Sequence, residues 1–199
     1  FDETNGKFIH YKNETANPLI LSSNVVRALY EDHQGTLWIG TGFPFDRNKP
    51  DDGGLNRLEP NGTFTRFMHD PDNPHSLINN KVRSVFEDSR GVFWVGTGGD
   101  GLHTMDREKG SFERHLFNAS KPDQLSRTPL KPGSWYDHIT FIKEDGSGAI
   151  WMGTFSAGVN RYDPVTQKII HFESSNGYAD KSAWMAYTSA DGVFWLTAS

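Results

Sequence analysis

The side chains of this chain that could carry chemistry lie mostly between its apolar runs, not within them. One loop holds three carboxylates, Asp46, Asp51 and Asp52, and carboxylate oxygens are ligands that Ca²⁺ prefers. His75 and His138 could serve as acid or base groups together with these carboxylates. Their spacing matches neither an EF-hand loop nor a HExxH zinc motif, and it brings no two catalytic groups together. We therefore expect no catalytic residues, no metal and no cofactor.

A second set of side chains in the same kind of segment suits the binding of a solute. Its aromatic members could stack on a sugar ring, or they could form a small satellite core that fixes the loops, and the sequence leaves both interpretations open. The predicted ligand-binding residues are Phe43, Phe45, Arg47, Asp51, Asp52, His75, Trp135 and Tyr136.

The elements that must position these side chains are repeated. Residues 80–117 contain four short runs, VRSVFE, VFWVG, LHTMD and FERHLF, separated by turns rich in Gly and Asp. Runs of this length with aromatic and β-branched residues predict β-strands. Matching segments recur before and after this unit, and their tryptophans are spaced by 44 to 57 residues, which is typical of four-stranded β-propeller blades. The equivalent tryptophans are Trp38, Trp94, Trp151 and Trp195.

The repeats predict an all-β fold, a β-propeller fragment made of four-stranded antiparallel blades in one domain. We expect three complete blades and a split or partial one. The sequence favours part of a longer propeller, with a self-closed ring of four blades as the alternative. The predicted boundaries are 24–67, 80–117 and 137–173 for the complete blades, 1–11 for the end of a preceding blade and 184–199 for the first two strands of a further one.

Several repeated residues have a structural interpretation. Gly35, Gly91 and Gly148 each follow an Asp by three residues, which suits a tight hairpin in which the Asp bonds its own backbone. The tryptophans could form a stacking platform for sugars, but their presence in every blade favours packing between blades. The glycine two residues after each of the first three tryptophans suggests close backbone approach inside a sheet.

The segment GTGGDG at 96–101 is followed by a predicted strand. A phosphate loop would need a helix there, so we expect a turn between strands. His10 and His171 occupy the outer-strand position that holds Arg66 and Arg114 in the other copies, and we expect them to be solvated edge residues.

Composition excludes several kinds of partner. The chain of 199 residues has a net charge of −5, which argues against binding to nucleic acid or to an anionic membrane surface. No apolar run approaches the roughly 20 residues needed to cross a bilayer, so we expect no direct membrane insertion. The chain contains no Cys, which removes disulfide and thiol chemistry.

The connections between strands differ in length on the two faces of the predicted blades. The turns between the first and second strands and between the third and fourth are short in every copy. The connections between the second and third strands and the links between blades are longer and more variable, and they share the other face. Elaborated loops on one face of a rigid scaffold are where binding usually resides.

The pattern NxVRxxxEDxxGxxWxGTxxxGLxxxD resembles the repeats of two-component regulator propellers, as does the linker HDPDNPHSL at 69–77. The resemblance implies a periplasmic or extracellular location and a role as the sensor region of a bacterial hybrid two-component system. Many members of the family have been linked to glycan fragments. The resemblance carries no catalytic motif.

We therefore predict a non-enzymatic sensor module that binds a small solute or oligosaccharide on the long-loop face. Its expected partners are the remaining blades of the same propeller and a downstream signalling domain, with self-association possible. The alternatives are a protein-interaction scaffold, and a propeller lyase or hydrolase that uses His75, Asp51, Asp52 or His138.

Overall fold

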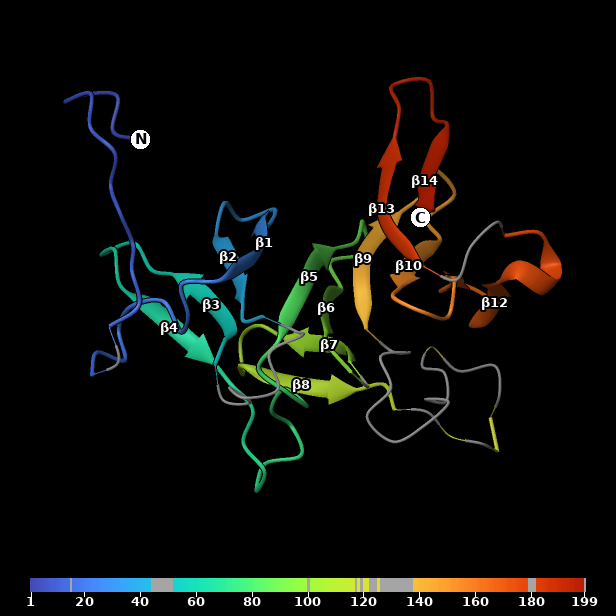
Figure 1. The fold of residues 1–199 in the computed structure, drawn as a ribbon, viewed down its shortest axis with the longest axis horizontal. Coiled ribbons are helices and arrows are strands. Elements are labelled where there is room, and N and C mark those ends of the chain that lie inside the picture. The colour runs from blue at the N-terminus through green and yellow to red at the C-terminus, as the bar shows by residue number, and fades with distance from the viewer. Residues whose placement is uncertain are drawn as a thin grey trace.

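The computed structural model shows a chain of antiparallel β-sheets (Figure 1). Within the described residues, three sheets have four strands and one has two, and the strands of each sheet follow one another in chain order. The prediction of an all-β fold with four-stranded antiparallel blades is confirmed. The structure describes residues 1–14, 16–43, 52–99, 101–116, 118, 120–121, 125, 138–178 and 182–198.

We number the sheets as blades 1 to 4 in chain order. Blade 1 contains β1 (Val26–Glu31), β2 (Leu37–Thr41), β3 (Gly54–Leu58) and β4 (Phe64–Phe67). Blade 2 contains β5 (Val82–Glu87), β6 (Phe93–Thr97), β7 (Leu102–Asp106) and β8 (Ser111–Arg114). Blade 3 contains β9 (Ile139–Glu144), β10 (Ile150–Thr154), β11 (Val159–Asp163) and β12 (Lys168–Phe172). A 3₁₀ turn, η1 (Ser174–Asn176), precedes blade 4, which contains β13 (Ala183–Thr188) and β14 (Phe194–Ala198).

The first strands of the blades are neighbours in the order β1, β5, β9 and β13 (Figure 1). Each blade therefore packs its face against the next blade. The first strand of each blade lies in this inner row, and its other strands follow outward in chain order. The hairpin β13–β14 projects beyond the other sheets at the top of the view.

An aspartate holds the turn between the first two strands of each complete blade. In blade 2, Asp88 Oδ1 accepts hydrogen bonds from the backbone N–H groups of Arg90 and Val92, each with a length of 3.0 Å. Its second oxygen, Oδ2, accepts the indole N–H of Trp94 over 3.0 Å. The other two complete blades contain the equivalent indole bond: Trp38 donates to Asp32 at 2.8 Å in blade 1, and Trp151 donates to Asp145 at 2.6 Å in blade 3. The repeated Asp thus closes the turn and orients the tryptophan of the following strand.

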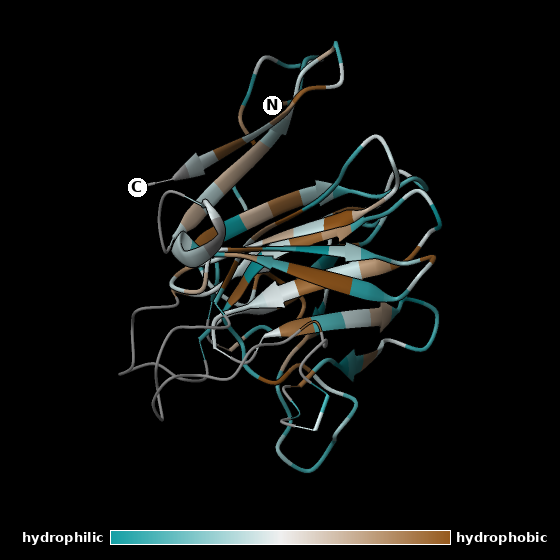
Figure 2. Ribbon diagram, turned by 90° about the vertical axis from the view of Figure 1, so that its right-hand side faces the viewer, coloured by the Kyte–Doolittle hydropathy of each residue, from teal (hydrophilic) through white to brown (hydrophobic). Residues whose placement is uncertain are grey.

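The tryptophans of blades 1 and 2 pack against the next blade. Trp38 is 1% exposed, and its ring centroid lies 4.8 Å from that of Phe93 in blade 2. The same core cluster contains Met105 and Phe112 from the two outer strands of blade 2. Trp94 packs in the same way into blade 3. Figure 2 shows the hydrophobic brown bands along the stacked strands, with mostly teal or white turns.

Gly40 and Gly96 allow neighbouring blades to approach closely. A Cβ on Gly40 would lie 2.7 Å from Val82 Cγ1, and one on Gly96 would lie 2.6 Å from Ile139 Cγ2. Val82 and Ile139 begin the first strand of the following blade. The expected approach inside a sheet is therefore only part of the explanation, because the tightest contacts at these two glycines cross from one blade to the next.

Blade 4 departs from this pattern. Ser189 takes the place of the turn aspartate, and its hydroxyl donates to the Val193 carbonyl over 3.1 Å. Trp195, at the position of the buried tryptophans, is 61% exposed. The shorter serine leaves no carboxylate for the indole. Blade 4 is also the last sheet of the chain, so no following blade covers Trp195 as Phe93 of blade 2 covers Trp38.

The outer-strand arginines anchor the links between blades. Arg114 Nε donates to the Ser76 carbonyl at 2.9 Å. Its Nη2 donates to Ser76 Oγ at 2.9 Å and to the Leu77 carbonyl at 3.1 Å. Arg66 makes the same kind of bonds to the link before blade 1. In blade 3, His171 is half-buried, with Nδ1 2.5 Å from Asn160 Oδ1, so the expectation of a solvated edge residue is wrong for it.

Candidate functional site

A cluster of basic and aromatic side chains gathers where the first strands begin. Because the links between blades and the connections after the second strands meet here, this is the long-loop face of the blades. The first strands place Arg27, Arg83, Thr140 and Trp184 at equivalent positions, as their pairing with the second strands shows. We call the group the first-strand cluster; it consists of Arg27, Phe43, Lys81, Arg83, His138, Phe155 and Trp184.

Blade 1 contributes a stacked pair to the first-strand cluster. The guanidinium carbon of the exposed Arg27 lies 4.8 Å from the ring centroid of Phe43, which is within the range of a cation–π contact. Phe43 follows β2 directly and is 37% exposed. Gly42, between β2 and Phe43, has a φ of 101° and donates its N–H to the Val25 carbonyl over 2.9 Å. This bond holds the start of the loop against the start of β1.

Blades 2, 3 and 4 meet on the other side of the cluster. The guanidinium carbon of Arg83 lies 5.9 Å from the Trp184 ring, which joins blade 2 to blade 4. Phe155 meets Trp184 edge to face at a centroid distance of 5.3 Å, and it lies 6.0 Å from His138. The cluster is therefore built from four sheets and not from a single loop.

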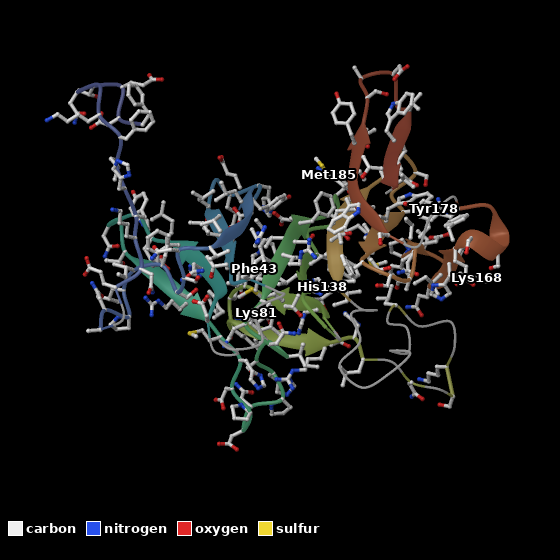
Figure 3. All side chains as sticks on the ribbon, viewed as in Figure 1. Phe43, Lys81, His138, Lys168, Tyr178 and Met185 are labelled. Carbon is white, nitrogen blue, oxygen red and sulfur yellow. The ribbon has the colours of Figure 1, made fainter. Side chains whose placement is uncertain are left out.

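Lys81 adds a third basic group beside Arg83 on the approach to β5. Its ammonium Nζ donates to the backbone carbonyl of Asp52 over 2.7 Å, across to the connection of blade 1. Its backbone N–H donates to Asn79 Oδ1 over 2.9 Å. Figure 3 shows Phe43, Lys81 and His138 toward the centre of the molecule, whereas Lys168 lies far from them, at the start of β12 in blade 3.

Burial and mutual repulsion determine the charges of the first-strand cluster. Burial lowers the pKa of Arg83 to about 10, with a further contribution from the positive charge of Arg27. Burial also lowers the pKa of His138 to about 3, and the nearby Arg83 charge adds to this shift. At neutral pH, His138 is therefore uncharged while Arg83 remains cationic, so the arginines and Lys81 supply the positive charge of the cluster.

The structure places only some of the predicted ligand-binding residues together. Phe43 lies in the cluster, and the backbone of Asp52 contacts it through Lys81. His75 lies elsewhere, because its carbonyl accepts the N–H of Phe112 on the outer strand of blade 2. The remaining predicted residues fall outside the described part of the chain: Phe45, Arg47, Asp51, Trp135 and Tyr136.

Sequence reasoning missed most of the cluster. Arg27 and Arg83 belong to the repeated pattern, and a residue type shared by two copies does not by itself indicate a site. A signal was present in Trp184, which replaces arginine at the equivalent position of the fourth copy and adds a tryptophan outside the repeated set. Lys81, Phe155 and His138 join these residues only through the packing of separate blades.

Metal binding finds no support in the part of the chain that can be described. Over those residues, no three His, Asp or Glu side chains gather in a way that could hold a metal ion. Two of the three aspartates in the suggested Ca²⁺ loop, Asp46 and Asp51, lie outside the described residues, and the third, Asp52, meets Lys81 through its backbone carbonyl.

The opposite, short-turn face carries many carboxylates, but they hold neighbouring blades together. The backbone N–H of His33 in blade 1 donates to Glu87 Oε2 of blade 2 over 3.0 Å, and its Nδ1 lies 2.5 Å from Glu87 Oε1. At the next boundary, Ser89 N donates to Glu144 Oε2 over 2.7 Å. We call this contact the inter-blade latch. At the equivalent position, blade 4 has Thr188, which has no carboxylate.

Arg107 reinforces the latch between blades 1 and 2. Its Nη1 donates to Asp32 Oδ2 over 2.8 Å, and its Nη2 pairs with Glu87 Oε1 over 2.5 Å. The guanidinium carbon also lies 5.0 Å from the Phe93 ring. Although burial alone would raise the pKa of Glu87, hydrogen bonds from the His33 backbone and Arg107 lower it. These carboxylates therefore act in the scaffold, and the first-strand cluster is the better candidate for binding.

Comparison with known families identifies the repeats. Residues 20–43 and 76–99 match the sequence profile described as "Two component regulator propeller". The chain carries two-component regulator propeller repeats. Both matched segments run from the link through the first two strands of a blade, and between them they contain Arg27, Phe43, Lys81 and Arg83.

A curated relative of these regulator propeller repeats is Histidine kinase P4 of Formosa agariphila. The two sequences are 29% identical over 172 residues, which is 85% of this chain and 11% of the relative. The chain therefore spans about a tenth of the length of that protein.

Solved structures show the same fold for these regulator propeller repeats. The extracellular domain of BT3049 from B. thetaiotaomicron, described as a hybrid two component system, superposes with a TM-score of 0.67 at 23% identity, over 87% of this chain and 22% of that one. The corresponding domain of BT4673 from the same organism gives 0.62 at 23% identity, over 89% and 22%. Virginiamycin B lyase from Staphylococcus aureus gives 0.55 at 13% identity, over 86% and 48%. The predicted β-propeller fold is confirmed. Among the described residues, no helix has the length and apolar character required to cross a membrane.

Proposed function

We propose that this chain is the ligand-sensing propeller module of a bacterial signalling receptor and that its solute binds at the first-strand cluster. The observation that carries the proposal is the meeting of stacked basic and aromatic side chains from four blades at one place on the long-loop face. The regulator propeller repeats and the histidine kinase relative support a signalling role. A periplasmic or extracellular location and membership of all four blades in one propeller domain are part of the same proposal.

The chemistry of the cluster suits a glycan fragment or a similar polar ring compound. Phe43 and Trp184 are each 37% exposed, so an aromatic surface remains accessible to a solute. Sites for small molecules combine such apolar surface with a few placed polar groups that fix orientation. Arg27 is exposed and can provide the polar groups, since guanidinium N–H groups donate to sugar hydroxyls.

Binding at this place can change the packing of blades. Arg27, Arg83 and Trp184 belong to blades 1, 2 and 4, so a solute that contacts all three favours one relative arrangement of those blades. A ligand shifts such an equilibrium only by its difference in affinity for the two arrangements. The remaining blades of the propeller and a downstream signalling domain would receive the shift.

The test is a thermal-shift and calorimetric screen of the chain against neutral and acidic oligosaccharides. A ligand present at 100 times its Kd stabilises the fold by about 2.7 kcal/mol. Phe43→Ala should weaken binding about five- to thirtyfold, since it removes an aromatic contact of roughly 1–2 kcal/mol. Tyr187→Ala, which truncates an exposed aromatic of β13 outside the cluster, is the matched control and should bind normally. Equal binding by both variants would rule out the first-strand cluster as the site.

One observation favours a protein-interaction scaffold as a second candidate. Blade 4 exposes large apolar side chains on its two strands, among them Met185 at 66%, Tyr187 at 65% and Trp195 at 61%. The equivalent residues of blade 1, Tyr30 and Trp38, are covered by Phe93 of blade 2, so the partner that this patch fits is a further blade or a protein surface of similar shape. Sedimentation velocity over a range of concentrations tests this: self-association that Tyr187→Ser or Trp195→Ser abolishes would support the scaffold, and a concentration-independent monomer would count against self-association through this surface.

A further inference from the structure

We propose that the outer rim between blades 2 and 3 carries a second binding site, which takes a small organic cation with a primary ammonium group on an aromatic or apolar body. The site lies where β8 of blade 2 faces the turn between β11 and β12 of blade 3, in a cavity of about 390 Å³. Figure 3 shows Lys168, which directly follows this turn, far from the labelled residues of the first-strand cluster, so the two sites are separate. Among the residues that line the cavity are Glu113, His115, Leu116, Leu125, Tyr162 and Gln167.

An aromatic side chain closes this rim position in the other two complete blades. Phe67 ends β4 and Phe172 ends β12, and each packs against the tryptophan of its own blade, with ring centroids 5.8 Å and 5.5 Å apart. In blade 2 the equivalent residue, identified by its bond to the start of the third strand, is His115. Its ring lies 6.0 Å from that of Trp94. A smaller, polar ring thus replaces phenylalanine in blade 2.

A second position beside this ring changes in the same blade. Arg57 in blade 1 and Arg161 in blade 3 pair with the tryptophan across the sheet, and each guanidinium carbon lies 5.8 Å from the indole ring. In blade 2 this residue is Thr104, whose Oγ1 lies 3.1 Å from His115 Nε2. The arginine and phenylalanine that cover the tryptophan in blades 1 and 3 are therefore replaced by a shorter pair, which leaves room at the rim.

The facing turn of blade 3 departs from the repeat as well. At the boundary between blades 1 and 2, Gly110 has a φ of 68°, and a Cβ added to it would lie 2.9 Å from the Phe67 ring. The pairing of the outer strands places Gln167 at the same position in blade 3. Gln167 has a φ of 56°, and no other described residue except glycines has a positive φ. Such strained residues cluster at ligand sites, and this one lines the cavity.

The charge at the cavity suits an ammonium group. Glu113 and His115 alternate with Arg114 along β8, so they face blade 3, while Arg114 donates to carbonyl groups of the link on the opposite face. Glu113 is exposed, and it forms no ion pair with any residue that the structure describes. Burial lowers the pKa of His115, so its ring is neutral at neutral pH and does not compensate the carboxylate. Glu113 can therefore accept a charge-assisted hydrogen bond from an ammonium group.

The remaining walls suit the body of such a ligand. Tyr162 is half-buried and meets Trp94 edge to face at a centroid distance of 6.2 Å, which fixes its ring against the core cluster of blade 3. An aromatic ring at this place can make a cation–π contact. Leu116, which is 48% exposed, and the half-buried Leu125 add apolar surface. The cavity thus combines the size, the apolar surface and the few polar groups that are typical of small-molecule sites.

The test is a titration of the isotope-labelled chain, followed by the NMR shifts of its backbone amides. Benzylamine is compared with benzyl alcohol, which has the same ring and no charge. A ligand of this size predicts a Kd on the order of 1 mM. We expect benzylamine to shift the amides of residues 113–116 and 162–167 and to bind at least about tenfold more tightly than benzyl alcohol, as expected for a hydrogen bond to a charged group. The preference should fall as the salt concentration rises.

Charge variants assign the preference to Glu113. Glu113→Gln keeps the shape of the side chain and removes its charge, so benzylamine should bind about tenfold or more weakly, much as benzyl alcohol does. Because Glu113 is exposed, this variant is expected to fold. Glu108→Gln removes a carboxylate from the exposed turn between β7 and β8 and should leave binding unchanged.

Two further variants test the cavity itself. Thr104→Arg/His115→Phe gives blade 2 the pair of residues found in blades 1 and 3, and it should abolish the shifts caused by both probes without lowering the thermal midpoint. Gln167→Gly should raise the thermal midpoint, because glycine adopts a positive φ without strain, and it should weaken benzylamine binding. Opposite effects on stability and binding would show that Gln167 serves the ligand and not the fold.

The outcomes separate this inference from the proposed function. Equal affinity for the two probes, or a preference that Glu113→Gln retains, would overturn selection of an ammonium group. Shifts confined to the first-strand cluster would overturn the rim as the site, as would the absence of a saturable shift at about 10 mM benzylamine, ten times the expected Kd. Each of these results leaves solute sensing at the first-strand cluster standing, because that proposal is tested with oligosaccharides and with Phe43→Ala.

Discussion

Replacing His103 by asparagine should make the fold less sensitive to acid. His103 is completely buried on β7, where its Nε2 accepts the N–H of Ile78 over 3.1 Å and its Nδ1 lies 3.2 Å from the Val95 carbonyl. Because Nε2 accepts a bond, the single proton of the neutral ring must be on Nδ1. A second proton would remove the acceptor for Ile78, so acid must break this contact.

The repeat itself supplies the substitution. In blade 1 the equivalent residue is Asn56, whose Nδ2 donates to the Ile39 carbonyl over 3.0 Å and whose Oδ1 accepts the N–H of Ser22 over 2.9 Å. Asparagine therefore makes both bonds without a titratable group. We expect His103→Asn to differ from the wild type by less than about 1 kcal/mol at pH 7, apart from the volume lost with the smaller side chain.

The expected magnitude follows from the pKa shift. Burial lowers the pKa of His103 to about 4 from the ordinary 6.5, so between these values the unfolded state binds more protons than the folded state. The free energy of unfolding therefore falls as the pH falls through this window, by about 1.4 kcal/mol for each pH unit. From pH 6.5 to pH 4 the contribution of His103 amounts to about 3 kcal/mol.

Urea denaturation followed by tryptophan fluorescence at pH 7, 6, 5 and 4.5 measures this contribution. Other buried histidines, such as His138, also titrate, so the quantity to compare is the difference between wild type and His103→Asn at each pH. This difference should shift steadily in favour of the variant as the pH falls. Asn56→His is the converse control and should add acid sensitivity. Parallel curves for wild type and His103→Asn would refute the assignment.

Three further substitutions test contacts between blades and the turn within blade 4. Glu87→Gln should lower the free energy of unfolding by about 1–3 kcal/mol, because the half-buried Arg107 loses one of its two carboxylate partners and keeps only Asp32. Chemical denaturation at pH 7 measures this change, and an unchanged midpoint would contradict the latch. Gly96→Ala should cost about 1–3 kcal/mol through its contact with the next blade, whereas Gly146→Ala, with nothing within 4 Å of its added Cβ, should cost almost nothing. Ser189→Asp should raise the stability measured by thermal unfolding by about 0.5–1.5 kcal/mol, because it restores an indole acceptor in blade 4.

The strands were predictable because the chain carries several copies of one unit. A single copy of VRSVFE is a short apolar run, but its match to the run that starts at Val26 determines its type and extent. The predicted strand at 82–87 agrees with β5, and the run predicted at 92–96 is β6, displaced by one residue. The last run, 112–117, was predicted too long, since β8 spans Ser111–Arg114. The chain leaves the ladder there to form the link to blade 3.

The contacts between blades were harder to predict, because they join residues about one repeat apart. Glu87 and His33 are separated by 54 positions, and nothing in the local sequence of either residue indicates the other. The clue was statistical: an adjacent Glu-Asp pair recurs in three copies and becomes Thr188-Ser189 in the fourth. Interpreting that pair required knowing that the Asp closes its own turn while the Glu reaches back to the preceding blade.

The same reasoning explains why the candidate site is better seen in the structure than in the sequence, and why blade 4 matters to it. The latch that joins blade 1 to blade 2 and blade 2 to blade 3 has no carboxylate in blade 4, yet Trp184 of that blade meets Arg83 in the first-strand cluster. The glutamate latch found at the first two blade boundaries is thus missing at the boundary between blades 3 and 4, where Trp184 joins the cluster. A part of the scaffold that is held by few contacts can move at low energetic cost when a ligand binds. Blade 4 is therefore the part of this chain in which binding at the cluster would most readily change the packing of one blade against another.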